Sequence, residues 1–270
     1  MRRLLVRPGG IGDCILTFPA MEHVKADYTE IWISRPIVPL LQFADIVRPL
    51  SSTGIDAAGI GDDEADRRLQ KRLSEFDSVV SWYGTNRPEF RHVVRASGVP
   101  STFYAALPPA GYKEHACDFF SRQVGAPRGL APKINVSAPS YGRMAVIHPF
   151  SGSTKKNWPL DRYQQLAKEL PLDANWVAGP EESLDSAVRF EHLDKLAAWL
   201  AAAQLYIGND SGITHLAAAV GVPVLALFGP TSPEVWSPRG KQVETLHHNP
   251  LSELAVETVT DAANRLLGSR

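Results

Sequence analysis

Short apolar runs alternate with helical patterns along the first half of the chain. The runs are rich in β-branched and aromatic residues and read RLLVR (3–7), EIWIS (30–34), DIVRPL (45–50) and DSVVSWYG (77–84). A helical pattern follows the first run, after Asp13. Strands that alternate with helices are typical of βα units on a parallel sheet. The first half therefore predicts a Rossmann-like domain over residues 1–135.

The alternation stops near residue 105 and restarts beyond residue 141. The stretch between holds LPPAG, GAPRGLAPK and SAPSYG, whose prolines, glycines and small residues are typical of loops and linkers. Strands are then predicted at MAVIH (144–148), NWVAG (175–179), LYIG (205–208) and VPVLALF (222–228), with helices from about Leu160 to Leu170, after Leu193 and from about Gly212. A second Rossmann-like domain is expected over 141–250. The helical pattern of 251–270 is expected to pack back on the first domain.

Composition excludes several classes of protein. With 44% hydrophobic and 21% charged residues among 270, the chain can bury a substantial core. A net charge of −1 gives no excess of positive charge of the kind that binds nucleic acid. The two cysteines, Cys14 and Cys117, predict neither a disulfide framework nor a metal site. The pattern contains no apolar run of membrane-spanning length, so we expect a cytoplasmic protein.

The block YIGNDSGITHLAAAVGVPVLALFGPTSPEVW (206–236) is the most informative for function. Its polar turn, Asn209 to Gly212, follows a strand, and ligands of open α/β sheets bind at the carboxyl ends of strands. Asp210 or Ser211 can cap the following helix, whose N-terminal N–H groups suit a phosphate. His215 lies one turn further on, beside a buried stripe expected at Ile213, Leu216, Ala217 and Val220. Capping alone, with His215 at the surface, is an equally open interpretation.

A second candidate is the loop HPFSGSTKKNWPLDRY (148–163). Its small residues include Ser151 and Ser153, and Lys155 or Lys156 could meet a diphosphate as a point charge. A solvated basic turn is the alternative. The loop lacks the Gly-Lys-Ser/Thr ending of a P-loop, which disfavours kinase-like chemistry.

Three further features could either bind a ligand or serve only the local structure. Glu181 or Glu182, after the predicted strand 175–179, could accept from ribose hydroxyls or could cap a helix. GGIGD completes no dinucleotide fingerprint, so an NAD-dependent oxidoreductase is disfavoured. A basic stripe, solvated or in contact with an anionic acceptor, is formed by Arg87, Arg91 and Arg95.

Three motifs in this order, RPGGIGD, KNWPLDRY and GNDSGITHLAAAVGVPVLALFGPT, resemble the ADP-heptose:lipopolysaccharide heptosyltransferases of glycosyltransferase family 9. The resemblance implies a GT-B-like α/β fold, in which two Rossmann-like domains with parallel sheets face a central cleft. It also implies an inverting transfer of heptose from ADP-heptose, without an essential metal or other cofactor. The implied acceptor is an anionic glycolipid of the lipopolysaccharide core, which leaves open a peripheral contact with the inner face of the cytoplasmic membrane.

The resemblance also assigns roles by position. Asp13 matches the general base, and Lys156 matches the lysine at the diphosphate. The donor side is expected to include Ser151, Ser153, Glu182 at the ribose, and Asp210, Ser211, Gly212 and His215; the acceptor side is expected to include Gly12, Arg87 and Arg91. Two departures, Phe150 in the loop and a short first half, keep open another nucleotide-sugar donor or a catalytically idle binding protein.

Overall fold

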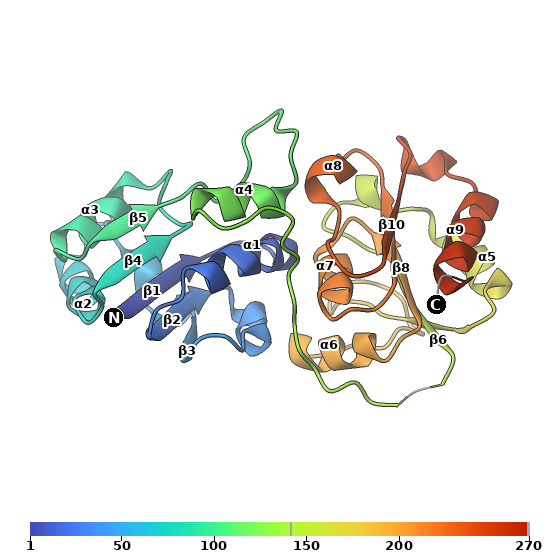
Figure 1. Ribbon diagram of the computed structural model, residues 1–270, viewed down its shortest axis with the longest axis horizontal. Coiled ribbons are helices and arrows are strands. Elements are labelled where there is room, and N and C mark those ends of the chain that lie inside the picture. The colour runs from blue at the N-terminus through green and yellow to red at the C-terminus, as the bar shows by residue number, and fades with distance from the viewer. Residues whose placement is uncertain (141, 269–270) are drawn as a thin grey trace. The chain divides into compact units, whose positions relative to one another are not determined.

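The chain folds into two compact units, and the computed structural model describes residues 1–140 and 142–268. The first unit comprises Met1–Tyr112 and Cys117–Leu130, and the second comprises Lys113–Ala116 and Ala131–Arg270. Each unit contains one parallel five-stranded sheet with helices packed against it (Figure 1). The α/β class with two Rossmann-like halves is confirmed.

The first sheet has the strand order β3-β2-β1-β4-β5. Its strands are β1 (Arg2–Arg7), β2 (Tyr28–Ile33), β3 (Ile46–Pro49), β4 (Ser78–Ser81) and β5 (Ser101–Phe103), and its helices are α1 (Ile11–His23), α2 (Asp63–Leu73), α3 (Pro88–Ala96) and α4 (Ala116–Gln123). Leu4 and Val6 belong to one buried cluster with the apolar faces of α2 and α3, whereas Leu5, also buried, lies outside that cluster. This alternation is the period-two pattern of a strand that is covered on both sides.

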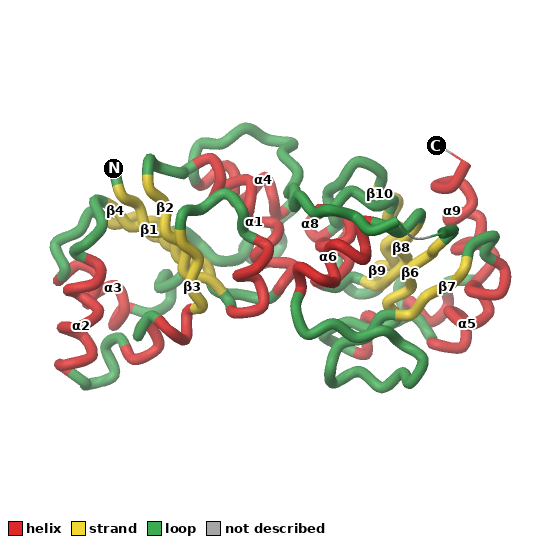
Figure 2. The backbone as a smooth tube through the Cα atoms, turned by 90° about the horizontal axis from the view of Figure 1, so that it is seen from below, coloured by secondary structure: helices red, strands yellow, loops and turns green. Residues whose placement is uncertain are grey.

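The second sheet has the strand order β10-β9-β8-β6-β7. Its strands are β6 (Met144–His148), β7 (Asp173–Trp176), β8 (Leu205–Asn209), β9 (Val224–Phe228) and β10 (Val243–His247), and its helices are α5 (Leu160–Glu169), α6 (Leu193–Ala201), α7 (Gly212–Ala219), α8 (Pro233–Trp236) and α9 (Val256–Gly268). In Figure 2, α5 and α9 lie on the side of this sheet opposite α6. The sheet is therefore covered on both faces.

The C-terminal helix α9 completes the second unit. Its buried residues Val259, Ala262, Ala263 and Leu266 share a cluster with α5 and with alternate residues of β6, β8 and β9. The expectation that 251–270 returns to the first domain is thus wrong, because this apolar stripe is used against the second sheet. The unit division also differs from the expected limits: it falls after Leu130, and 113–116 joins the second unit, where His115 Nε2 lies 2.8 Å from Ser237 O.

Several local expectations need correction. Helix α1 begins at Ile11, so Asp13 lies in its first turn and not before the helix. The strand expected at 175–179 lies at 173–176, and β5, β10 and α4 were not predicted. Helix α7 has no single buried stripe: Thr214 to Ala219 are all buried, and Ile213 and Val220 are only half-buried. Segments outside the sheet also cover this helix, since Gly240 packs against Ala218.

Candidate functional site

The second sheet has a topological switch point between β6 and β8. The chain continues from β6 to β7 on one side and from β8 to β9 and β10 on the other. Residues after the carboxyl ends of β6 and β8 therefore lie side by side, which is where open α/β sheets bind ligands. His148 ends β6 and Asn209 ends β8, and both predicted donor-side segments begin here.

Lys156 and Asp210 meet at this edge. Lys156 Nζ lies 2.7 Å from Asp210 Oδ2, and Thr231, after β9, donates its hydroxyl proton to the same oxygen at 2.6 Å. The Lys156 side chain is 30% exposed, whereas Asp210 is buried. The ammonium group is thus anchored by a buried carboxylate yet reachable from solvent. Sequence reasoning assigned Lys156 and Asp210 to one donor side, an assignment that stays a prediction, and overlooked Thr231, which the strand-end rule could have found.

Asn209 fixes the loop after β6 on β8. Its fully buried side-chain amide donates to Pro149 O at 2.8 Å, and its Oδ1 accepts from Trp158 N at 3.0 Å and from Tyr163 Oη at 2.9 Å. A buried amide with satisfied donors and acceptors specifies one arrangement. Asn209 therefore holds both ends of the segment that carries Lys156.

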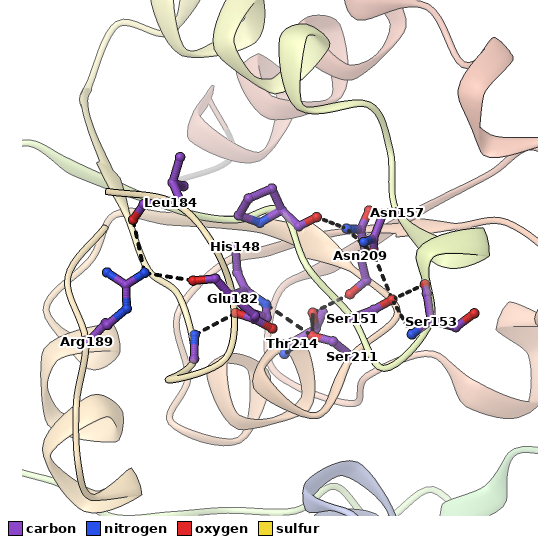
Figure 3. A network of polar contacts seen from close by, with 12 residues as sticks. His148, Ser151, Ser153, Asn157, Glu182, Leu184, Arg189, Asn209, Ser211 and Thr214 are labelled. Carbon is purple, nitrogen blue, oxygen red and sulfur yellow. Dashed lines mark hydrogen bonds and ion pairs between the residues drawn. The ribbon is translucent and has the colours of Figure 1, made fainter. Parts of the chain in front are cut away.

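Ser151 and Ser153 form hydrogen bonds within that segment. Ser151 Oγ lies 2.8 Å from Ser153 O and 2.7 Å from Asn157 Oδ1, and Ser153 N donates back to Ser151 Oγ at 3.4 Å (Figure 3). The expected ligand role of the two serines remains a prediction, since the hydrogen bonds of both residues lie within the loop. Phe150 lies before them, with its ring centroid 6.2 Å from that of His148.

Ser211 caps helix α7, as one sequence interpretation expected. Its Oγ accepts from Thr214 N at 3.4 Å, and Thr214 Oγ1 donates to Asn209 O at 2.5 Å. Gly212 is the first helical residue and is half-buried. Backbone N–H groups at the start of a helix and the positive end of its dipole suit an anion. The N-terminus of α7 thus lies directly after Asp210, whose carboxylate holds the Lys156 ammonium group.

His148 joins the start of α7 to Glu182. His148 Nε2 lies 3.1 Å from Glu182 Oε2, and its Nδ1 lies 3.4 Å from Ser211 Oγ (Figure 3). Gly179 N donates to the same Glu182 oxygen at 2.6 Å. Burial raises the pKa of Glu182, but the hydrogen bonds from His148 and Gly179 outweigh burial and lower it overall. Glu182 is therefore a carboxylate at neutral pH.

Arg189 completes this network by holding the loop that carries Glu182. Its Nη2 donates to Glu182 O at 2.7 Å and to Leu184 O at 3.2 Å. Neither His148 nor Arg189 was selected from sequence. His148 ends a strand that was predicted correctly, so the strand-end rule could have identified it, whereas nothing in the sequence pattern indicates Arg189.

His215 is buried rather than at the surface. It is 6% exposed, and burial lowers its pKa to about 4, with Asp210 opposing this and His115 and Lys156 adding to it. Within the described ranges, His215 Nδ1 has no hydrogen-bond partner. The imidazole is therefore neutral at pH 7, with an unsatisfied nitrogen near the Lys156 and Asp210 pair.

Asp13 lies in the first unit, where the turn after β1 leads into the first turn of α1. Gly10 N donates to Asp13 Oδ2 at 3.3 Å, and Gly9 adopts a φ of 132° in the same turn. Buried Arg7 supports the turn from below, donating to Pro8 O at 2.7 Å and to Asp13 O at 3.0 Å. The carboxylate is half-buried at the switch point of the first sheet, next to Gly12, and its role as a base stays a prediction.

The two arginines expected at an acceptor are held by aromatic rings in the first unit. The Arg91 guanidinium lies 5.2 Å from the Phe103 ring centroid, and that of Arg87 lies 5.2 Å from the Tyr83 ring centroid. Arg95 is exposed. The stripe is therefore partly stacked, and its contact with an acceptor is untested.

The described part of the chain contains neither a clustered metal site nor a membrane-spanning helix. Residues 1–140 and 142–268 contain no group of three or more His, Cys, Asp or Glu side chains arranged to hold a metal ion. Among their helices, none combines the length and the apolar character that crossing a membrane requires.

Comparison with known proteins extends these observations. Residues 191–263, which include the turn after β8 and helix α7, match the model of the family described as Glycosyltransferase family 9 (heptosyltransferase). Lipopolysaccharide heptosyltransferase 1 of Pseudomonas aeruginosa is 26% identical over 289 residues, covering 86% of this chain and 80% of that protein.

Solved structures agree with the fold. The E. coli ADP-heptose LPS heptosyltransferase II superposes with a TM-score of 0.78 at 18% identity, covering 100% of this chain and 99% of that one. The E. coli heptosyltransferase WaaC with ADP superposes with a TM-score of 0.73 at 17% identity, covering 98% and 100%. These likenesses confirm the expected GT-B-like fold class. The chain is therefore similar to glycosyltransferase family 9 (heptosyltransferase) over residues 191–263, and to a lipopolysaccharide heptosyltransferase over most of its length.

Proposed function

We propose that this glycosyltransferase moves a heptose from ADP-heptose to an anionic acceptor of the lipopolysaccharide-core type, with inversion and without a metal ion. One observation carries the proposal: the ammonium group of the partly exposed Lys156 side chain lies 2.7 Å from Asp210, directly before the N-terminus of α7. An ammonium group and unpaired helix N–H groups at a strand-end site suit a diphosphate. The names of the relative from Pseudomonas aeruginosa and of the E. coli enzyme with ADP support heptose and adenine.

The donor is proposed to lie along the carboxyl edge of the second sheet. Lys156 and the first N–H groups of α7, at Ser211 and Gly212, bind the diphosphate, and the loop of Ser151 and Ser153 lies beside it. Glu182 accepts from ribose hydroxyls. Asp210 and neutral His215 adjoin the sugar, where the unsatisfied Nδ1 can accept or donate one hydrogen bond.

The proposed reaction is a single displacement. The carboxylate of Asp13 takes the proton of the acceptor hydroxyl, whose oxygen forms a bond to the anomeric carbon while the bond from that carbon to ADP breaks. ADP leaves with the bonding electron pair. Lys156 and the positive end of the α7 dipole stabilise the charge that develops on the diphosphate, which is the task a divalent ion performs in other transferases.

The acceptor is proposed to be an anionic glycolipid, met at the inner face of the cytoplasmic membrane. Arg87 and Arg91, both half-buried in the first unit, are the proposed contacts for its anionic groups, together with the Gly12 backbone. Guanidinium groups bind phosphates and carboxylates through paired hydrogen bonds.

Transfer from ADP-heptose, compared with other ADP-, UDP- and GDP-sugars, tests the proposal directly. We expect ADP-heptose to be the preferred donor, the product to have the inverted anomeric configuration by NMR, and the rate to persist in EDTA. Asp13→Asn should lower kcat by at least about 100-fold, because loss of a general base costs about 10²–10⁴-fold.

Glu22→Gln serves as the matched control, because Glu22 is an exposed carboxylate on the same helix α1. It should leave kcat unchanged. Wild-type kcat in Asp13→Asn would refute the assignment of the base. Preference for another sugar nucleotide would refute the donor, and tight ADP binding without turnover on any donor would indicate a catalytically idle binding protein.

A further inference from the structure

His148 lies between two parts of the second unit that are far apart in sequence. The ring is 3% exposed at the carboxyl end of β6, with Nε2 at 3.1 Å from Glu182 Oε2 and Nδ1 at 3.4 Å from Ser211 Oγ. Figure 3 shows the ring between Glu182 on one side and the Ser211 and Thr214 pair on the other. One buried side chain thus connects the loop after β7 with the start of α7.

Hydrogen-bond chemistry fixes which nitrogen carries the proton. A carboxylate oxygen only accepts, so Nε2 must donate to Glu182, and a neutral ring then has Nδ1 as its acceptor. The Ser211 hydroxyl can donate to Nδ1 while its oxygen accepts from Thr214 N at 3.4 Å. Both ring nitrogens of His148 and the Ser211 hydroxyl are therefore satisfied with one orientation of the ring.

Glu182 is held through one of its two oxygens. Oε2 accepts from both His148 Nε2 and Gly179 N, at 3.1 and 2.6 Å. Oε1 has no hydrogen-bond partner in the described part of the chain, and the side chain is 26% exposed. The carboxylate is therefore fixed through Oε2, and Oε1 is left to accept a hydrogen bond from a ligand. A carboxylate that accepts two donors on one oxygen cannot rotate without breaking both.

We propose that His148 is a positioning residue that fixes Glu182, as acceptor for the ribose hydroxyls, relative to the diphosphate end of the site at the N-terminus of α7. This inference rests on the proposed function, in which a nucleoside diphosphate is the donor group. It implies that His148 contributes to binding affinity only for some ligands. A ligand with ribose hydroxyls should bind more tightly because of His148, and a ligand without them should not.

Two amide substitutions distinguish the roles of the two ring nitrogens. Glutamine can place its side-chain NH₂ near the position of Nε2 and so keep a donor for Glu182, whereas asparagine reaches only the position of Nδ1. Both are neutral amides that differ by one methylene group. His148→Gln and His148→Asn therefore form a matched pair.

The experiment measures calorimetric affinities of the full chain for ADP, 2′,3′-dideoxy-ADP and inorganic diphosphate. The wild type should prefer ADP over dideoxy-ADP by about tenfold or more, as expected for hydrogen bonds to a charged group. His148→Gln should keep most of this preference. His148→Asn should reduce it to within about twofold of unity, with diphosphate affinity within about twofold of wild type in both variants.

The other outcomes refute either the positioning role of His148 or the proposed function. A wild type that binds ADP but does not discriminate against dideoxy-ADP, or equal preference in wild type and His148→Asn, refutes the positioning role and leaves the proposed function standing. Equal losses for ADP, dideoxy-ADP and diphosphate in both variants refute it as well, because they indicate a purely structural residue. A wild type that binds no ADP refutes the proposed function, and the role of His148 with it.

Discussion

Lys156 and its neighbour Lys155 differ in ways that only the folded chain reveals. Lys156 Nζ contacts buried Asp210, whereas Lys155 is exposed and contributes its backbone carbonyl near Gly229. Sequence reasoning could not choose between them without the family resemblance, because both are lysines of one polar loop. The difference arises from the 3₁₀ turn Thr154–Lys156, which directs adjacent side chains apart.

Replacing either lysine tests this distinction. Lys156→Met should weaken ADP binding by at least about tenfold, because it removes the point charge beside the diphosphate. Lys155→Met should leave the affinity within about twofold of wild type. Isothermal titration with ADP measures both. Equal weakening by the two substitutions would show that the loop acts only through its net charge.

His215 predicts how stability changes in mild acid. Burial first, and then His115 and Lys156, lower its pKa to about 4, and Asp210 acts in the opposite direction. Between about pH 6.5 and pH 4 the unfolded chain binds a proton at this residue that the folded chain does not. Stability therefore rises with pH across this window, and its loss levels off below about pH 4.

Urea unfolding at pH 7 and pH 4.5 measures the effect. Going from pH 7 to pH 4.5 should cost the wild type about 2 kcal/mol more than it costs His215→Gln, which has no imidazole to titrate. His192→Gln is the control, because His192 is exposed, and it should keep the pH dependence of the wild type. An identical pH dependence in wild type and His215→Gln would contradict the assigned pKa.

Residue patterns predicted where the polar groups lie in the fold, but not which groups they hydrogen-bond. Asp210, Ser211 and Lys156 were placed correctly at strand ends because that rule depends only on local sequence. The bond between His148 and Glu182 joins residues 34 positions apart, and it depends on the register of β6 beside β7. The burial of His215 was not predicted, because it depends on segments distant in sequence, such as that of His115, whose charge acts on His215.

At the level of elements, most strands were predicted from their apolar runs, whereas the edge strands β5 and β10 were not. Strand β10 reads VETLH and is half-buried apart from exposed His247, and β5 has only three residues. Such edge strands carry too few apolar residues for a period to be recognised. In WVAG the apolar run continues beyond β7, because Val177 and Ala178 are buried although the strand ends at Trp176.

The contact between the loop before β10 and α7 makes a second stability prediction. A Cβ on Gly240 would lie 2.8 Å from Ala218 O, a backbone atom inside α7 that cannot move aside. Gly240→Ala should therefore destabilise the protein by about 2 kcal/mol, as overpacking does. A lower urea midpoint with an unchanged slope would show it.

Gly152→Ala provides the matched control for that substitution. A Cβ on Gly152 meets no atom within 4 Å, and the residue has no positive φ, so its urea midpoint should equal that of the wild type. A Gly240→Ala midpoint equal to that of Gly152→Ala would mean that the loop moves away from α7 without cost.

At the scale of the whole molecule, the candidate residues divide between the two units. Lys156, Glu182 and the Asp210 turn lie in the second unit, and Asp13 and the arginine stripe lie in the first. Alternating strands and helices predicted this two-part architecture. The assignment of 113–116 to the second unit could not be predicted, because it depends on tertiary contacts such as that of His115 with Ser237.

This division predicts how nucleotides stabilise the molecule. A ligand that binds only the folded state raises the unfolding free energy by about 2.7 kcal/mol at 100 times its Kd. In thermal unfolding with ADP, UDP or GDP at equal concentration, ADP should therefore give the largest rise in Tm. The rise should fall to about half or less in Lys156→Met, because a tenfold weaker affinity lowers the gain to about 1.4 kcal/mol. It should persist in Asp13→Asn, because Asp13 is assigned to the acceptor. A larger rise with UDP or GDP would refute adenine selectivity but not the site. An undiminished rise in Lys156→Met would mean that the nucleotide binds elsewhere.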